Sequence, residues 1–255
     1  MSVNVPTKIL PSGARIPMIG LGVYQSEPGP ETYNAILTSL KLGYRHIDTA
    51  EIYGNEEDVG RAVRDSGIPR EEIFVTTKLF TTNWGYSKAL AAGKASNDRL
   101  GIVYIYLYLL HAPGPPKERA DTWRAVEDLR EQETLRDIGV SNFNETLLAT
   151  LRKTAHIKPA VNQVELHPWM MRQSLVNYQD GRPCLGLYCR RDRSYTRPSA
   201  GGVRRRQRIR DAAHRDRLKS NLESVKLKVT PEQVVKLASP DSYLRTAGCD
   251  QDRVM

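Results

Sequence analysis

Apolar segments alternate with amphipathic segments along the first 178 residues. Runs rich in β-branched, aromatic and leucine residues predict a short first strand entering residues 20–25 and further strands over 44–50, 73–80, 102–111, 136–143 and 159–168. Apolar positions that recur every three or four residues predict helices over 31–43, 55–67, 86–101, 119–132 and 145–154 and from residue 173 onward. A hairpin over 8–22 precedes them, with Pro11, Ser12 and Gly13 at its turn.

Six β-then-α units in a row predict a parallel sheet covered by helices. Two architectures fit this pattern: a doubly wound open sheet and a (β/α)8 barrel. A dinucleotide-binding open sheet should carry G-x-G-x-x-G after its first strand, but residues 20–25 read GLGVYQ and lack the third glycine. The chain has 255 residues, and a single barrel needs about 250. We therefore predict one α/β barrel domain over residues 1–255.

Ionisable side chains stand where the predicted strands end. Asp48 ends the second strand and Tyr53 follows in its loop, while Lys78 and His111 stand at the ends of the third and fourth strands. Each has an alternative interpretation as a cap, a surface aromatic or a solvated strand end. The carboxyl ends of barrel strands meet at one rim, however, and barrel enzymes place their chemistry there. Four ionisable groups at this rim predict an active site.

These four side chains suit proton transfer to a carbonyl oxygen. The pKa of a tyrosine is about 10, and a neighbouring ammonium lowers it. Tyr53 is therefore the candidate general acid, with Lys78 and Asp48 tuning it, and His111 can orient a substrate oxygen by a hydrogen bond. No nucleophile accompanies them, so a hydride from a bound cofactor fits best.

The stretches GYRHIDTAEIYGNEEDVGRAV, IFVTTKL, YLLHAP, IGVSNF and VNQVELHP resemble, in this order, the signature stretches of the aldo-keto reductases. The resemblance extends from about Lys8 to Tyr178. It implies a (β/α)8 barrel that binds NADPH and reduces an aldehyde or ketone to the alcohol. It also implies that the catalytic tetrad consists of Asp48, Tyr53, Lys78 and His111.

The same resemblance implies further binding residues. The nicotinamide carboxamide would be bound by Ser141, Asn142 and Gln163. The adenosine 2′-phosphate and the adenine would contact Arg217 and Asn221. The substrate pocket would be walled by Tyr24, Phe80 and Trp84, for which surface or core packing is the alternative. A small departure is Glu133, which stands where the family usually has a glycine at a helix end.

The sequence changes character after Tyr178. Residues 179–216 show neither strand nor helix periodicity, and the motif that grips the phosphate of NADPH in the family is absent. Residues 182–217 hold twelve arginines, no lysine and three aspartates, which together equal the net charge of +9 of the whole chain. The resemblance resumes at Arg217, and Thr230 is predicted to cap a last helix. We interpret 179–216 as an altered segment, from a shifted reading frame or a mis-spliced exon. The barrel is therefore expected to be incomplete, with a disrupted seventh and eighth unit.

The composition argues against a membrane-spanning or secreted protein. No stretch reaches the roughly 18 apolar residues of a membrane span, and the N-terminus lacks the pattern of a signal peptide. Three cysteines are too few for a disulfide framework. We therefore expect a cytoplasmic protein with no membrane partner; a monomer is compatible with the sequence.

Two other functions stay open at this point. Twelve arginines could bind nucleic acid, but their segment has only two tyrosines and no recognisable binding motif. A pseudoenzyme that keeps a partial barrel as an interaction surface is the other alternative. Zinc binding by Cys184, Cys189 and His214 is rejected because the spacing matches no standard ligand set, so no metal is expected.

Overall fold

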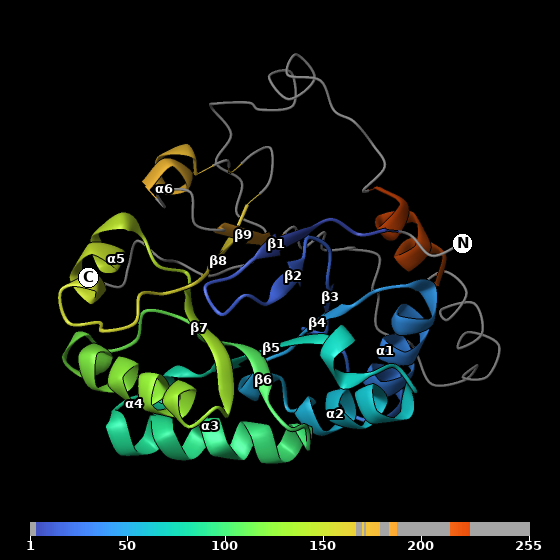
Figure 1. Cartoon of the computed structure of the whole chain (residues 1–255), viewed down its shortest axis with the longest axis horizontal. Coiled ribbons are helices and arrows are strands. Elements are labelled where there is room, and N and C mark those ends of the chain that lie inside the picture. Colours follow the sequence, from blue (N-terminus) through green and yellow to red (C-terminus); the bar gives the residue numbers. More distant parts are fainter. Residues whose placement is uncertain (1–3, 167–169, 171, 179–183, 188–214, 225–255) are drawn as a thin grey trace, which may run out of the picture.

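The computed structural model describes residues 4–166, 170, 172–178, 184–187 and 215–224. Near the N-terminus β1 (Thr7–Ile9) and β2 (Arg15–Pro17) form an antiparallel hairpin, which confirms the predicted one. All other described strands belong to a second sheet (Figure 1).

The second sheet is parallel, and its seven described strands stand side by side in chain order. They are β3 (Leu21–Gly22), β4 (His46–Asp48), β5 (Phe74–Leu79), β6 (Ile105–Leu110), β7 (Leu135–Ser141), β8 (Asn162–Glu165) and β9 (Cys184–Leu187). Parallel strands in chain order, joined by helices, are the arrangement of a (β/α) barrel. The predicted fold class is confirmed.

Strand β9 corrects one prediction. The sequence predicts neither strand nor helix over 179–216, yet Cys184–Leu187 pairs in parallel with β8, with Cys184 opposite Asn162. Four residues are too few to show an alternating pattern, and the hydrogen bonds of this strand come from its neighbour β8. The first element of the seventh unit is therefore present. Residues 188–214 and the predicted cap at Thr230 lie outside the described part of the chain.

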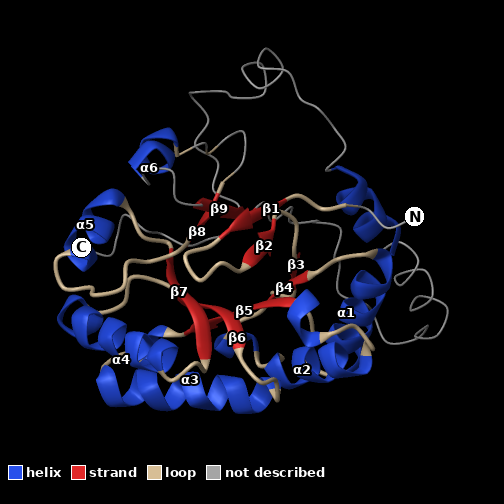
Figure 2. Cartoon of the chain, viewed as in Figure 1, coloured by secondary structure: helices blue, strands red, loops and turns tan. Residues whose placement is uncertain are grey.

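Helices connect the strands and surround the sheet (Figure 2). They are α1 (Pro30–Leu42), α2 (Glu56–Asp65), α3 (Tyr86–Leu100), α4 (Arg119–Glu131), α5 (Glu145–Arg152) and α6 (Gln173–Tyr178). Short 3-10 turns are η1 (Glu51–Tyr53), η2 (Arg70–Glu72), η3 (Thr81–Asn83) and η4 (Pro116–Glu118). The predicted helical faces are buried: Ile36 and Leu40 of α1 belong to the same apolar core as Ile47 of β4. Gly43 ends α1 in the left-handed conformation, with φ 110°.

The hairpin packs into the interior of the sheet at the beginnings of its strands. Leu10 and Ile16 share an apolar cluster with Phe74, the first residue of β5. The backbone N–H of Ser12 donates to the Asp137 carboxylate on β7 over 3.2 Å. One end of the sheet is thereby covered, which leaves the carboxyl ends of the strands for a site.

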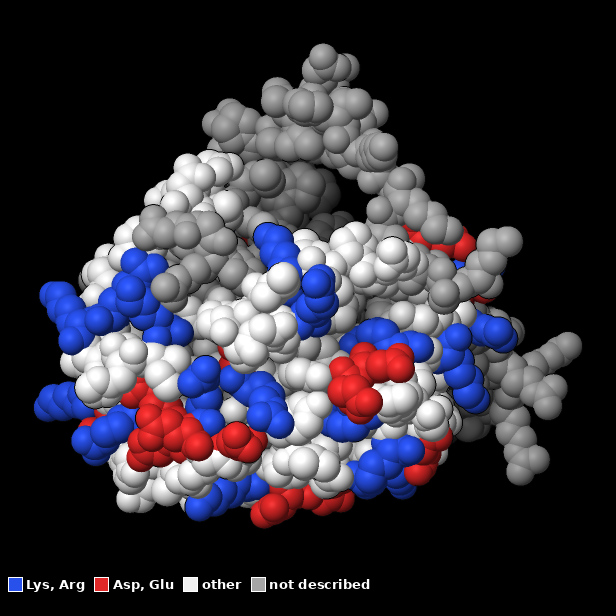
Figure 3. All heavy atoms as spheres, in the orientation of Figure 1, with Lys and Arg blue, Asp and Glu red and all other residues white. Residues whose placement is uncertain are grey.

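Residues 215–223 are helical and dock near the first strand of the sheet. Leu218 and Leu222 pack with Tyr44, and the Tyr44 hydroxyl donates a hydrogen bond of 3.0 Å to the Leu218 carbonyl. On the face shown in Figure 3, basic and acidic side chains of the described residues are interspersed. This agrees with the concentration of the net charge in residues 182–217.

Candidate active site

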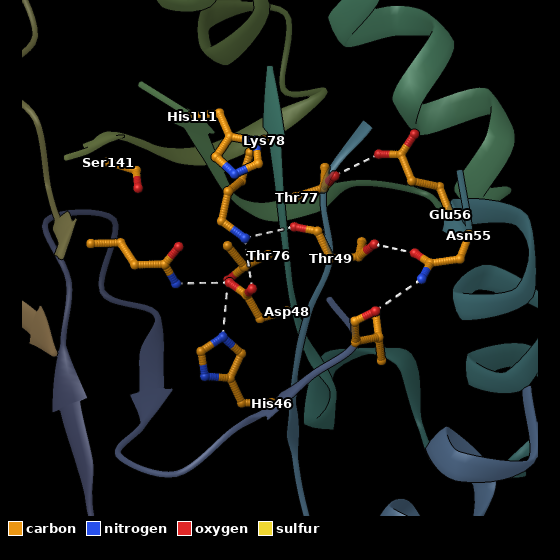
Figure 4. A network of polar contacts seen from close by, with 12 residues as sticks. His46, Asp48, Thr49, Asn55, Glu56, Thr76, Thr77, Lys78, His111 and Ser141 are labelled. Atoms are coloured by element: carbon orange, nitrogen blue, oxygen red, sulfur yellow. Dashed lines mark hydrogen bonds and ion pairs between the residues drawn. The ribbon is translucent and has the colours of Figure 1, made fainter. Parts of the chain in front are cut away.

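A buried ion pair forms the centre of the site (Figure 4). Lys78 Nζ lies 2.6 Å from Asp48 Oδ1 and donates a second hydrogen bond, of 2.8 Å, to the carbonyl oxygen of Thr49. The pair forms because β4 and β5 are neighbours whose register sets Asp48 opposite Thr76, two residues before Lys78. Lys78 is 1% exposed and Asp48 6%. Buried charges need such hydrogen-bonded partners.

Tyr53 ends the turn η1 and lies over this pair. Its ring centroid is 5.3 Å from Lys78 Nζ, 5.0 Å from the Tyr24 ring and 5.6 Å from the His111 ring. The four residues predicted to form the tetrad are therefore gathered at the carboxyl ends of β4, β5 and β6.

His111 follows β6, and its backbone N–H donates to the Leu79 carbonyl over 3.0 Å. Burial and the positive charge of Lys78 lower the pKa of His111 to about 4. The imidazole is therefore neutral at pH 7, with one donor and one acceptor nitrogen. Its Nδ1 atom is buried and has no hydrogen-bond partner among the described residues. An unpaired buried nitrogen is a position where a polar atom of a bound molecule can be accommodated.

The three predicted carboxamide-binding residues lie together beside the ion pair. Ser141 at the end of β7 stands opposite Gln163 of β8. Asn142 has the left-handed φ of 64°, and its Nδ2 donates to the Ser141 hydroxyl and to the His111 carbonyl, each over 3.2 Å. Gln163 Nε2 donates to Asp48 Oδ2 over 2.9 Å. A hydroxyl and two amides offer both donors and acceptors, which fits a carboxamide.

The predicted pocket residues take different positions. Tyr24 is 58% exposed beside Tyr53, and the Phe80 ring lies 5.9 Å from His111. Trp84 is 1% exposed and belongs to the apolar core, against Gly114, where a Cβ would come within 2.5 Å of the indole. Trp84 is predicted to wall the substrate pocket, with surface or core packing as the alternative, and its burial agrees with core packing.

Arg217 and Asn221, predicted to bind the adenosine part of the cofactor, lie on the exposed side of helix 215–223. The helix is anchored from its other side by Leu218 and Leu222. The contacts of these two residues with a cofactor stay a prediction.

Sequence reasoning missed the side chains that support the tetrad. Asn55 is fully buried and bonded to Thr49, whose Oγ1 donates to Asn55 Oδ1 over 2.6 Å. Glu51 accepts a hydrogen bond of 3.0 Å from the backbone N–H of Phe80. Both residues lie two positions from Tyr53 in the stretch EIYGNEE, but the sequence pattern of this stretch indicated only the acidic start of a helix. Their closeness to Tyr53 along the chain was the one feature of the sequence that could have indicated a supporting role.

In the part of the chain that the structure describes, no three His, Cys, Asp or Glu side chains gather as metal ligands. Its helices include none with the length and apolarity needed to span a bilayer.

Comparison with known proteins identifies relatives of the chain. The model of the Aldo/keto reductase family matches residues 18–178. A 9,11-endoperoxide prostaglandin H2 reductase of Trypanosoma cruzi is 49% identical over 175 residues, which are 69% of this chain and 62% of the relative. Glyoxal reductase of Bacillus subtilis is 46% identical over 173 residues, which are 68% and 62% of the two proteins. The chain therefore spans less than two thirds of the length of these curated relatives.

A solved structure extends the likeness to the fold. An aldo-keto reductase of Bombyx mori in complex with NADP matches with a TM-score of 0.79 and 26% identity, over 96% of this chain and 95% of that chain. The family model covers every strand from β3 to β8, and so includes Lys78 and the three residues gathered around it. The chain belongs to the aldo/keto reductase family.

Proposed function

We propose that this protein reduces an aldehyde or ketone to the alcohol by hydride transfer from NADPH, with Tyr53 as the proton donor. The observation that carries the proposal is the buried Lys78–Asp48 pair with the rings of Tyr53 and His111 beside it. The relatives support the reaction class, since two of them are named as reductases and a similar structure was solved with NADP.

Each side chain has a defined task in this proposal. The neutral imidazole of His111 orients the carbonyl oxygen by a hydrogen bond, and the Tyr53 hydroxyl donates its proton to the same oxygen. The Lys78 ammonium, 5.3 Å from the Tyr53 ring centroid, stabilises the phenolate that Tyr53 leaves. Asp48 holds Lys78 in place.

The cofactor, when bound, supplies the hydride that the side chains lack. Ser141, Asn142 and Gln163 would hold its carboxamide, and Arg217 and Asn221 its adenosine end. Tyr24 and Phe80 would border the substrate. We also propose the cytoplasm as its location and a single barrel domain as its organisation.

A thermal melt of the 255-residue chain with and without NADPH tests cofactor binding. A cooperative transition that NADPH raises is expected, because a ligand of the native state stabilises it by mass action. Reduction of glyoxal, followed by NADPH absorbance, then tests the chemistry. Tyr53→Phe should keep the NADPH-induced shift and lose turnover. A melt that NADPH leaves unchanged, together with no turnover, would refute the proposal.

A further inference from the structure

The turn that carries Tyr53 is held on one side by a buried pair, Thr49 and Asn55. Both residues are 0% exposed. Asn55 Oδ1 accepts from the Thr49 hydroxyl over 2.6 Å, and Asn55 Nδ2 donates to the carbonyl of Val23 over 3.1 Å. Val23 directly precedes Tyr24, whose ring touches Tyr53. The amide therefore joins the loop after β3 to the loop after β4.

Asn55 makes these contacts instead of capping a helix. It occupies the N-cap position of α2, where an asparagine side chain commonly accepts a backbone hydrogen bond and contributes about 1 kcal/mol. Here the side chain makes no capping hydrogen bond. Its polar atoms are turned toward the loops around Tyr53, which indicates that those contacts, and not helix initiation, decide the residue at this position.

Thr49 connects the pair directly to the ion pair. Its hydroxyl bonds Asn55, while its carbonyl accepts the 2.8 Å hydrogen bond from Lys78 Nζ. Its backbone N–H is held by the Thr76 carbonyl at 2.9 Å. A path of hydrogen bonds thus joins Lys78 to the residue two positions after Tyr53 (Figure 4).

The opposite side of the turn has an independent attachment. Glu51, at the start of η1, accepts hydrogen bonds from the backbone N–H of Phe80 and from the Asn83 side chain. Loss of the Thr49–Asn55 contact would therefore weaken the attachment at the end that carries Tyr53 and leave the Glu51 end unchanged.

We propose that Thr49 and Asn55 are positioning residues that set the Tyr53 hydroxyl against Lys78. The inference rests on the proposed function for the catalytic meaning of this placement, but the placement of Tyr53 beside Lys78 is testable without turnover. Among the described residues, the titratable groups seen to face Tyr53 are Tyr24, Lys78 and His111, with Asp48 behind Lys78.

The test uses four variants of the full chain, of which Thr49→Val and Thr122→Val keep the side-chain volume nearly unchanged. Thr49→Val removes the hydroxyl and keeps the carbonyl that bonds Lys78, while Thr49→Ser restores a hydroxyl. Thr122→Val is the control: Thr122 is also 0% exposed, and its hydroxyl accepts from the N–H of Gly85, before α3, over 2.8 Å and donates to the carbonyl of Glu118, before α4, over 2.7 Å. Asn55→Ala repeats the perturbation from the other partner.

Two readouts are compared. The first is the ionisation of Tyr53, taken as the tyrosinate absorbance of each variant minus that of the same variant carrying Tyr53→Phe, without cofactor. The second is kcat and KM for glyoxal with NADPH. In Thr49→Val we expect the Tyr53 titration to move to higher pH, since an ammonium favours a phenolate less when the hydroxyl lies farther from it. We expect kcat to fall roughly 10- to 100-fold with KM changed less than about twofold.

Thr49→Ser should recover wild-type values, and Thr122→Val should change neither readout. If Thr49→Val titrates and turns over like Thr122→Val, the pair is structural only and the inference is overturned. If the wild type does not turn over but Thr49→Val still shifts the Tyr53 titration, the positioning role stands and the proposed function fails.

Discussion

Replacing Glu133 with glycine should stabilise the protein. Glu133 follows the end of α4 with a φ of 61°, in the left-handed region where a side chain is disfavoured. A non-glycine residue there costs roughly 1–2 kcal/mol, because Cβ crowds the backbone. Glycine offsets about 0.5–1 kcal/mol of this gain, because it has more conformational freedom in the unfolded chain and loses that freedom on folding. The net gain is about 0.5–1 kcal/mol in the free energy of unfolding.

The assay is urea unfolding followed by circular dichroism, with the free energy taken at a common m-value. A gain of about 1 kcal/mol corresponds to roughly 2–4 °C in Tm for a domain of this size. Glu131→Gly is the matched control, since Glu131 is also exposed and also acidic but is the last helical residue of α4. There glycine should destabilise by up to about 1 kcal/mol. A loss of stability in Glu133→Gly, or the same change in both variants, would refute the backbone argument.

Three further changes should alter the stability of the protein by distinct mechanisms. Lys78→Met leaves Asp48 buried without its cation and should cost about 3–5 kcal/mol in urea unfolding. Burial lowers the pKa of His46 to about 4, so the folded state binds fewer protons than the unfolded state below pH 6.5. The free energy of unfolding therefore falls as the pH is lowered from 6.5 toward 4. His46→Gln should reduce that fall by on the order of 2 kcal/mol at pH 5. Gly60→Ala should cost about 3 kcal/mol or more, because a Cβ would lie 1.6 Å from the Leu100 carbonyl oxygen.

Two control variants make the same kind of substitution at sites that are exposed or unhindered. Arg61→Met removes a cation that pairs with Asp58 while 51% exposed, and should cost less than about 1 kcal/mol. Gly22→Ala adds a methyl group where nothing lies within 4 Å, so it should leave stability nearly unchanged. Losses equal to those of Lys78→Met and Gly60→Ala would contradict the burial arguments.

The meeting of the side chains at the strand ends could be predicted, because the carboxyl ends of parallel strands lie at the same edge of the sheet. The alternation of apolar and amphipathic segments fixed the order of the elements, and a parallel sheet in that order brings Asp48, Lys78 and His111 to one edge. Register alone then makes the ion pair, since β4 and β5 are neighbours. The meeting of Asp48, Lys78 and His111 thus follows from periodicity and topology.

The supporting contacts could not be predicted in the same way. Asn55 bonds the carbonyl of Val23, thirty-two residues earlier, and this depends on the path of two loops. Trp84 could have walled a pocket or filled the core, and its burial is decided by the close approach of Gly114. Strand β9 depends on hydrogen bonds from β8, which leave no trace in the periodicity of its own four residues.

The order of the described strands also indicates which half of the site should tolerate a change in residues 179–216, the segment that we interpret as altered. The strands that carry Asp48, Lys78 and His111 are β4, β5 and β6, and each has a hydrogen-bonded neighbour on both sides. Their ends are therefore fixed by ladders formed within residues 21–141, and the described hydrogen bonds of the ion pair, to Thr49 and Gln163, come from residues before β9. The predicted adenosine contacts, Arg217 and Asn221, lie beyond that segment. A change in this segment should therefore weaken NADPH binding more than it weakens the Lys78–Asp48 pair, so the NADPH-induced shift of the melt and the stability loss of Lys78→Met locate the effect independently.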